Sequence, residues 1–265
     1  MGAIGIFDSG VGGLTVLRSI AERLPGVPMV YLGDTARVPY GAKSRDTVIR
    51  YARACAELLL ERDISMLVVA CNTASAFALD ILREELDVPV LGVIEPGARD
   101  AVAATRNQCV GVIGTAGTVR SGAYQHIIRQ LVPSMHVVAK ACPLFVPLAE
   151  EGWTEGPVPL AVAGEYLNDF RESGIDTLVL GCTHYPLLRR VIGETMGKEV
   201  ALVDSADATS RVVAEVVSSM APSLVSQDAA RRLRFLVTDA PEAFAQVGRR
   251  FLGHDIGPVE WVDVV

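Results

Sequence analysis

The stretch LVVACNTASA, residues 67–76, joins a run of Val and Leu to a cysteine and a series of small polar residues. Such a run predicts a buried strand that ends near Cys71 and turns directly into a helix. A second stretch, LVLGCTHYPL at 178–187, repeats this pattern around Cys182. Each cysteine therefore stands at an expected strand end and is followed by hydroxyl, amide or imidazole side chains.

Short apolar runs alternate with helix-like segments along the chain, which predicts an α/β fold with parallel sheets covered by helices. The expected strands are 4–8, 29–33, 66–70, 89–93, 110–114, 136–140, 177–181, 201–204, 234–239 and 259–264. The expected helices lie near 13–24, 43–61, 73–86, 96–106, 118–131, 158–173, 184–196, 207–220 and 240–252.

A weak internal repeat divides the chain. IGIFDS (4–9) aligns with VGVIGT (110–115) at an offset of 106 residues, and the two cysteine stretches align at an offset of 111. We interpret the repeat as two similar α/β domains related by pseudo-symmetry. The first is expected to span 1–96 plus 207–265, and the second 97–206. Val-rich strands recur in any α/β chain, but the paired cysteines favour a true repeat.

Composition excludes several classes of protein. The chain has 265 residues, half of them hydrophobic, and a net charge of −7, which argues against a nucleic-acid or membrane-surface binder. No signal peptide and no membrane-spanning run is evident. The five cysteines are widely spaced without a CxxC pair, which disfavours a disulfide framework or a structural zinc site. A reducing cytoplasm is the expected location.

The loops after the strands predict where a ligand binds. FDSG, GDT, CNT, GTAGT and CTH all fall at carboxyl ends of expected strands, where α/β sheets bind ligands. Their backbone N–H groups and hydroxyls at helix starts suit an anion such as a carboxylate. The GVGGLT segment (10–15) matches neither a dinucleotide-binding nor a phosphate-binding glycine motif, so we interpret it as a tight turn.

Cys71 and Cys182 are the candidate reactive residues, because a helix start favours the thiolate. Cys55, Cys109 and Cys142 lack this setting and are interpreted as structural. Two thiols facing each other across a cleft could form a redox disulfide, bind a soft metal, or act as acid and base on opposite faces of one carbon. Only the third explains the repeat, since racemisation removes a proton from one face and returns one to the other.

Asp8 and His184 could tune the thiols or relay their protons. Two other interpretations stay open at this point. Asp8 could be the N-cap of the helix after the glycine turn, and His184 could be a polar residue that satisfies a helix start.

Seven long stretches resemble one family: IGIFDSGVGGLTVLR, VYLGDTARVPYG, VVACNTASA, GVIEPG, GVIGTAGTVRSGAY, ACPLFVPLAEEG and LVLGCTHYPLL. The sequence resembles the glutamate racemases of the cofactor-independent aspartate/glutamate racemase superfamily. The resemblance implies two α/β domains with the site between them, glutamate as substrate, no pyridoxal phosphate, no metal, a homodimer, and a role in supplying D-glutamate for peptidoglycan. Only three lysines occur, and none stands out as a cofactor lysine.

The resemblance also implies residue roles. Cys71 would act on the face of D-glutamate and Cys182 on that of L-glutamate. Asp8 would assist Cys71, and His184 with Glu150 would assist Cys182, although the adjacent Glu151 is an alternative. The implied substrate-binding residues are Asp8, Ser9, Pro39, Tyr40, Gly41, Asn72, Thr73, Thr115, Thr118, Thr183 and His184. An aspartate racemase and a non-catalytic binding protein remain the alternative functions.

Overall fold

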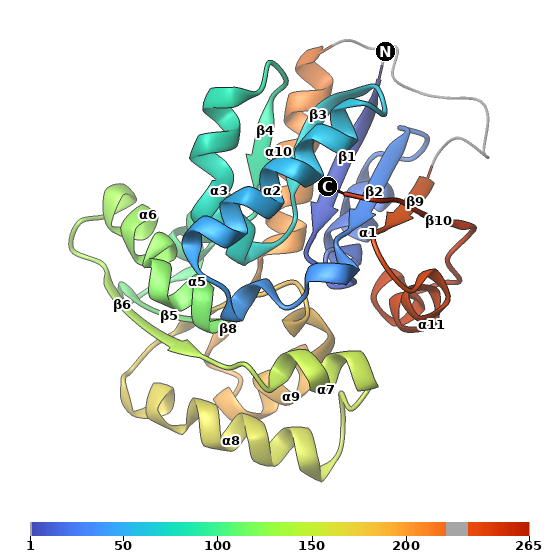
Figure 1. Ribbon diagram of the computed structural model, residues 1–265. Coiled ribbons are helices and arrows are strands. Elements are labelled where there is room, and N and C mark those ends of the chain that lie inside the picture. The colour runs from blue at the N-terminus through green and yellow to red at the C-terminus, as the bar shows by residue number, and fades with distance from the viewer. Residues whose placement is uncertain (1, 221–232, 265) are drawn as a thin grey trace.

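The computed structural model describes residues 2–220 and 233–264, which form two parallel sheets (Figure 1). The first sheet has the order β10-β9-β2-β1-β3-β4, and the second has the order β6-β5-β7-β8. The strands are β1 (Ala3–Asp8), β2 (Met29–Gly33), β3 (Ile64–Val69), β4 (Val90–Gly92), β5 (Cys109–Gly114), β6 (His136–Ala141), β7 (Thr177–Gly181), β8 (Ala201–Asp204), β9 (Leu233–Val237) and β10 (Val259–Trp261). The predicted α/β class and each predicted strand are confirmed.

Most expected helices are present, with three differences. The helices are α1 (Leu14–Arg23), α2 (Arg45–Leu60), α3 (Asn72–Glu85), α4 (Ile94–Ala104), α5 (Ala116–Ser121), α6 (Ala123–Leu131), α7 (Phe145–Glu151), α8 (Pro157–Glu172), α9 (Arg189–Met196), α10 (Ser205–Met220) and α11 (Pro241–Leu252). The single helix expected over 118–131 is wrong, because Gly122 adopts a left-handed conformation with φ +68° and divides α5 from α6. Helix α7 was not expected. The segment after Cys182 begins as the 3₁₀ turn η3 (Tyr185–Leu188).

The two sheets repeat the same strand order. In the first, β1 lies between β2 and β3, with β4 beyond β3; in the second, β5 lies between β6 and β7, with β8 beyond β7. The aligned sequence segments thus form the equivalent strands β1 and β5, and each candidate cysteine follows the strand beside them, β3 or β7. The C-terminal strands β9 and β10 extend only the first sheet.

The division into domains 1–96 plus 207–265 and 97–206 stays a proposal. Its boundaries fall in the first turns of α4 and α10, two helices that pack against each other. Residues 221–232 of the proposed first domain lie outside the described part of the chain.

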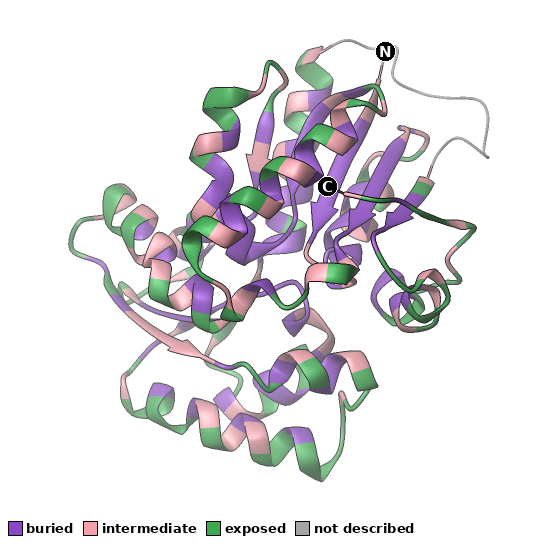
Figure 2. Cartoon of the chain, in the orientation of Figure 1, coloured by how far each residue is buried: buried purple, intermediate pink, exposed green. Residues whose placement is uncertain are grey.

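Helices cover both faces of each sheet, so the strands are almost continuously apolar. In β1, Ile4 and Ile6 join the core beneath α1, while Phe7 points to the opposite core beneath α2 and α3. This alternation follows from the two-residue period of a strand. Figure 2 shows the central strands of both sheets buried, the edge strands partly exposed and the outer faces of the helices exposed. The second sheet is enclosed in the same way by α8 and α9 and by α4 and α6.

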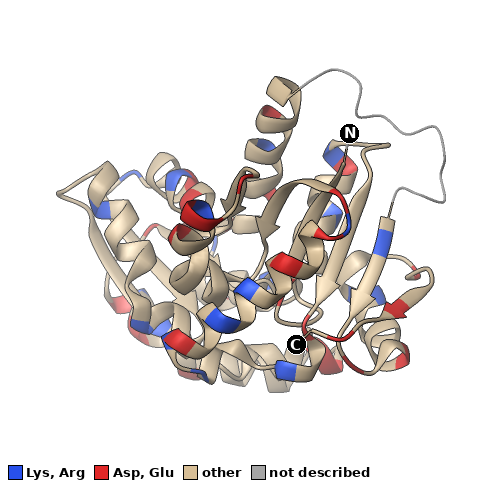
Figure 3. Ribbon diagram, turned by 45° about the horizontal axis from the view of Figure 1, so that its top comes forward, with Lys and Arg blue, Asp and Glu red and all other residues tan. Residues whose placement is uncertain are grey.

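Charged residues lie mainly on the outer turns of the helices and in loops, with both signs interspersed (Figure 3). Within 2–220 and 233–264, no helix combines the length and apolar character needed to cross a bilayer.

Candidate active site

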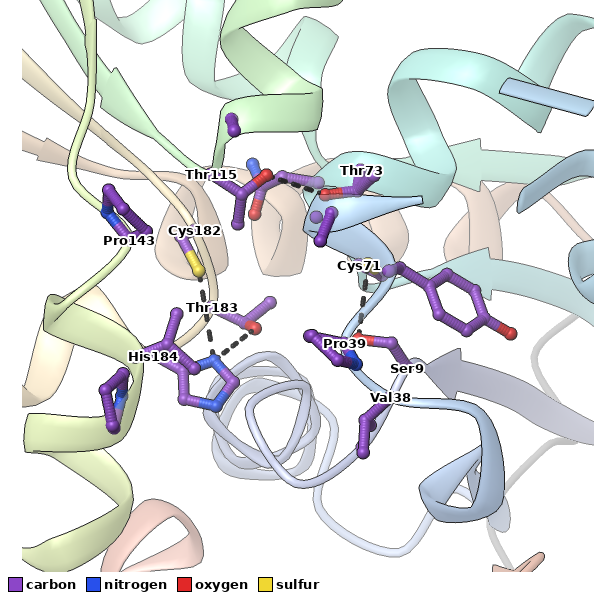
Figure 4. Close-up of a pocket in the computed structure, with 18 of the residues that line it drawn as sticks. Ser9, Val38, Pro39, Cys71, Thr73, Thr115, Pro143, Cys182, Thr183 and His184 are labelled. Atoms are coloured by element: carbon purple, nitrogen blue, oxygen red, sulfur yellow. Dashed lines mark hydrogen bonds between the residues drawn. The ribbon is translucent and has the colours of Figure 1, made fainter. Parts of the chain in front are cut away.

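A cavity of about 240 Å³ opens where the carboxyl ends of strands from both sheets meet (Figure 4). Its lining combines the two cysteines, hydroxyl and amide side chains and a group of prolines. The lining residues are Ser9, Gly10, Val38, Pro39, Tyr40, Gly41, Ala42, Cys71, Asn72, Thr73, Thr115, Ala116, Pro143, Val146, Pro147, Glu150, Cys182, Thr183 and His184. The structure therefore brings together all sequence-predicted site residues except Asp8 and Thr118, which do not line this cavity.

Cys71 lies between β3 and α3, as the N-cap residue of α3. Its Sγ is 3.7 Å from the Ser9 hydroxyl. Burial is the main cause that raises the pKa of the Cys71 thiol, to about 12, and the nearby Asp8 carboxylate raises it further against the smaller opposing effects of the Ala74 amide and Ser9. With its pKa raised in this way, Cys71 is a thiol at neutral pH and can donate a proton.

Asp8 ends β1 and is 1% exposed. Its Oδ2 accepts a hydrogen bond from the amide of Gly10 at 2.9 Å, whereas its buried Oδ1 has no hydrogen-bond partner. Burial raises the pKa of Asp8, and the charge of His184 and nearby amides oppose that rise. The alternative interpretation of Asp8 as the N-cap of α1 is wrong, because Gly13 is the N-cap and no side chain caps it.

Cys182 belongs to a chain of contacts on the opposite side of the cavity. Its Sγ lies 3.8 Å from Nδ1 of His184, and Nε2 of His184 lies 2.8 Å from Oε1 of Glu150. A carboxylate can only accept, so Nε2–H donates to Glu150 and leaves Nδ1 facing the thiol. Glu150, and not the exposed Glu151, makes this contact.

His184 is 7% exposed and both ring nitrogens face acidic groups. Burial alone would lower the pKa of His184, but the hydrogen bonds and negative charges of Cys182 and Glu150 outweigh it and raise the pKa to about 10. His184 is therefore an imidazolium at neutral pH. In this form Nδ1 can donate to a Cys182 thiolate, and after losing that proton it can accept another from the thiol.

Hydroxyl and amide groups at the starts of α3 and α5 form another wall. Thr73 Oγ1 is 2.8 Å from Thr115 Oγ1 and 3.3 Å from Thr118 Oγ1. Asn72 donates through Nδ2 to the Tyr124 hydroxyl at 2.9 Å, and its buried Oδ1 has no hydrogen-bond partner. These contacts join the two sheets at one edge of the cavity, because α3 follows β3 and α5 follows β5.

The GDTARVPYG stretch forms the wall that contains Pro39, Tyr40 and Gly41. The Tyr40 hydroxyl does not point into the cavity, because it donates to buried Asp34. The single Nε–H of Arg37 is shared between the two carboxylate oxygens of Asp34, at 2.9 and 2.8 Å, and Thr238 donates to Asp34 at 3.0 Å. This buried network fixes the loop between β2 and α2.

Sequence reasoning missed several residues that shape the cavity. An apolar group that consists of Val38, Pro143, Val146 and Pro147 lines it beside the polar residues. The glycine turn at 10–15 was predicted from the sequence, but the residues that it packs against were not. A Cβ added at Gly12 would lie 2.3 Å from Thr183 Oγ1 and 2.4 Å from His184 Nδ1, so only glycine lets the turn approach the Cys182 side this closely.

The two cysteines approach one cavity from equivalent positions in the two sheets (Figure 4). Each has a titratable neighbour, Asp8 for Cys71 and His184 for Cys182. A carbon atom held between them would face one sulfur on each side. Such an arrangement can move a proton between opposite faces of that carbon.

Comparisons with known proteins agree with this geometry. The model of the Asp/Glu/Hydantoin racemase family matches residues 4–213. Glutamate racemase of Geobacter metallireducens is 57% identical over 262 residues, which cover 99% of this chain and 97% of that protein. The structure of glutamate racemase from Francisella tularensis with D-glutamate superposes with a TM-score of 0.91 at 36% identity, covering 99% and 97% of the two chains. That of glutamate racemase from Thermus thermophilus with beta-chloro-D-alanine gives a TM-score of 0.89 at 46% identity, with the same coverage.

The fold, the paired cysteines and these matches define the class: the chain is an isomerase of the amino-acid racemase type. More particularly, it belongs to the Asp/Glu/Hydantoin racemase family, and its full-length relatives are glutamate racemases.

Proposed function

We propose that this protein interconverts L-glutamate and D-glutamate by a two-base proton transfer that uses Cys71 and Cys182 and no cofactor. One observation carries the proposal: the cysteines that end equivalent strands of the two sheets line the same cavity. The names of the full-length relatives support glutamate as the substrate.

In the L-to-D direction, the Cys182 thiolate removes the α-proton and becomes a thiol. The Cys71 thiol then donates its proton to the opposite face of the carbanion and becomes a thiolate. The raised pKa of Cys71 agrees with its role as donor in this direction. Proton exchange through His184 and Asp8 restores the starting state, and the roles of the cysteines reverse in the other direction.

The three proposed assisting groups have different roles. His184 exchanges a proton with Cys182 through Nδ1, while Glu150 holds the ring through Nε2. Burial and, to a smaller extent, the negative charge of Asp8 keep Cys71 protonated, since both raise the pKa of that thiol. The two sides of the cavity therefore use different chemistry, a carboxyl group for Cys71 and an imidazolium for Cys182.

The carbanion needs stabilisation because the α-proton beside a carboxylate is weakly acidic. We propose that hydroxyls and main-chain amides at the helix starts bind the carboxylates, and that the apolar wall excludes water. The proposed substrate contacts are Ser9, Pro39, Tyr40, Gly41, Asn72, Thr73, Thr115, Thr183 and His184, with Asp8 and Thr118 acting from behind them.

We also propose that the protein supplies D-glutamate for peptidoglycan and that it assembles as a homodimer.

The proposal is tested by supplying L-glutamate or L-aspartate to the purified protein with a reducing agent and a chelator and without pyridoxal phosphate. Circular dichroism of the glutamate sample should decay to zero, whereas that of aspartate should persist. Faster decay with aspartate would identify an aspartate racemase. Tight binding of glutamate with an unchanged signal would identify a binding protein. As controls, Cys71→Ser and Cys182→Ser should each reduce turnover about 10²- to 10⁴-fold without loss of folding.

A further inference from the structure

The C-terminal helix α11 is anchored on the first sheet. It follows β9 and packs against α1. Gly248 lies so close to α1 that a Cβ there would be 2.7 Å from Leu14 Cδ1. The ring of Phe244 lies 5.9 Å from that of Tyr31, a residue of β2. Helix α11 is therefore packed on the half of the molecule that carries Cys71.

The last turn of α11 nevertheless touches the assisting pair on the Cys182 side. The Phe251 ring is fully buried and meets the His184 ring edge to face, with centroids 5.1 Å apart and an interplanar angle of 78°. The guanidinium of the neighbouring Arg250 donates from Nη1 to the main-chain carbonyl of Glu150. One helical turn thus contacts both His184 and Glu150.

The Arg250 contact fixes the end of α7. The last carbonyls of a helix have no partner within the helix, and a cationic side chain is a favourable donor to them. Gly152, the C-cap of α7 with φ +77°, adjoins the guanidinium, because a Cβ there would lie 3.1 Å from Arg250 Nε. Arg250 is therefore in direct contact with the main chain at the end of α7, where Glu150 stands.

The adjacent Arg249 provides an internal comparison. It is exposed in the same turn, and its side chain makes no hydrogen bond or ion pair to any residue that the structure describes. The two arginines have the same charge and stand in the same last turn of α11. Only Arg250 is joined to the Cys182 side.

We propose that Arg250 is a positioning residue for the Cys182 half of the reaction. By fixing the end of α7, it holds Glu150 against Nε2 of His184 and thereby aims Nδ1 at the Cys182 sulfur. This inference rests on the proposed racemase function. Because α11 is anchored on the first sheet, the positioning is complete only while both halves of the molecule keep the observed arrangement.

The kinetic test compares Arg250→Met with Arg249→Met and Arg250→Lys. Arg250→Met should lower kcat/KM about tenfold, the loss expected for one hydrogen bond from a charged donor, and equally in both directions because the two enantiomers have equal free energy. Arg250→Lys, which keeps a cationic donor, should recover much of the activity. Arg249→Met should behave as wild type.

Isotope effects distinguish positioning from general damage. If Arg250→Met slows the Cys182 step, the effect of α-deuteration on kcat/KM should rise with L-glutamate, from which Cys182 removes the proton. It should fall with D-glutamate, for which the Cys71 step ceases to limit the rate. Isotope effects that stay constant or change together would overturn the inference, as would an equal response of Arg249→Met.

A measurement that does not depend on turnover tests the role of Arg250 separately from the racemase proposal. The groups that face His184 are Cys182, Glu150 and Asp8, so a displaced Glu150 should lower the pKa of His184 in nitrogen-15 NMR titrations of Arg250→Met but not of Arg249→Met. An unchanged titration overturns the inference whether or not glutamate is racemised. A shifted titration in a protein without turnover would contradict the racemase proposal and support the action of Arg250 on His184.

Discussion

The hydroxyl oxygens of Thr73 and Thr115 lie 2.8 Å apart, which joins the start of α3 to the residue before α5 at one edge of the cavity. The two threonines follow strands of different sheets. Thr115 also caps α5 by accepting a hydrogen bond from the Thr118 amide at 3.2 Å. This pair therefore connects the two sheets at the cavity wall that the starts of α3 and α5 form.

Replacing Thr115 by Val should weaken glutamate binding and α5 together. We expect KM to rise about 10- to 100-fold if the hydroxyl contacts a carboxylate, and the free energy of unfolding to fall by about 1 kcal/mol through loss of the cap. Initial rates and urea unfolding measure the two effects. Thr115→Ser retains the hydroxyl and should resemble wild type. A KM unchanged in Thr115→Val would show that the Thr115 hydroxyl does not contact the substrate.

Gly12→Ala should disrupt the Cys182 side of the site. The added methyl group would overlap Thr183 Oγ1 and His184 Nδ1, so we expect a large loss of kcat and about 1–3 kcal/mol of destabilisation from overpacking. Gly164→Ala is the matched control. Gly164 lies inside α8 with open space around its Cα, so this change should stabilise the protein by about 0.5–1 kcal/mol. Normal turnover in Gly12→Ala would contradict the described approach of the turn to His184.

Stability should depend on pH through His184. Its pKa rises from 6.5 to about 10 on folding, so the folded protein holds the proton more tightly than the unfolded chain. The stabilisation is fully present below pH 6.5 and is lost as the pH rises through about 10. Urea unfolding of wild type and His184→Gln should therefore differ most at the acidic end of this range. A difference that grows toward pH 10 would show that folding does not raise the pKa of His184.

The buried network around Asp34 should be important for stability. The Asp34 side chain is fully buried, and its Arg37 partner is 19% exposed. Asp34→Asn leaves the arginine without its counter-charge, and we expect a loss of about 3–5 kcal/mol in urea unfolding. Glu85→Gln breaks the exposed Arg53–Glu85 pair and should leave the urea unfolding curve close to that of wild type. Equal losses in the two variants would exclude a special role for the buried pair.

Much of the fold was predictable because its signals are local. Runs such as MLVVA and TLVLG form strands that are buried on both faces, and no tertiary information is needed to recognise them. The cysteines could be paired because the repeat places both at equivalent strand ends. Helix α7 escaped prediction because it is seven residues long and contains Pro147, although a proline within the first turn of a helix sacrifices no hydrogen bond.

The features of the site that the sequence did not predict depend on contacts between segments far apart in the chain. The direction of the Tyr40 hydroxyl is set by Asp34, and Asp34 is in turn bound by Thr238, which lies 204 residues further along the chain. The contact between Arg250 and the Glu150 carbonyl spans 100 residues. Periodicity within a segment carries no information about such pairings. Only the three-dimensional arrangement of the chain reveals them.

The two-base proposal is tested most directly by the isotopic content of the first product formed in deuterated water. Unlabelled L-glutamate should yield D-glutamate that carries deuterium at the α-carbon from the earliest times, while the remaining L-glutamate keeps its hydrogen. Cys71 and Cys182 would then exchange protons with solvent independently. First-formed D-glutamate that retains the original α-hydrogen would mean that a single group moves the proton between the two faces, and would contradict the two-cysteine mechanism.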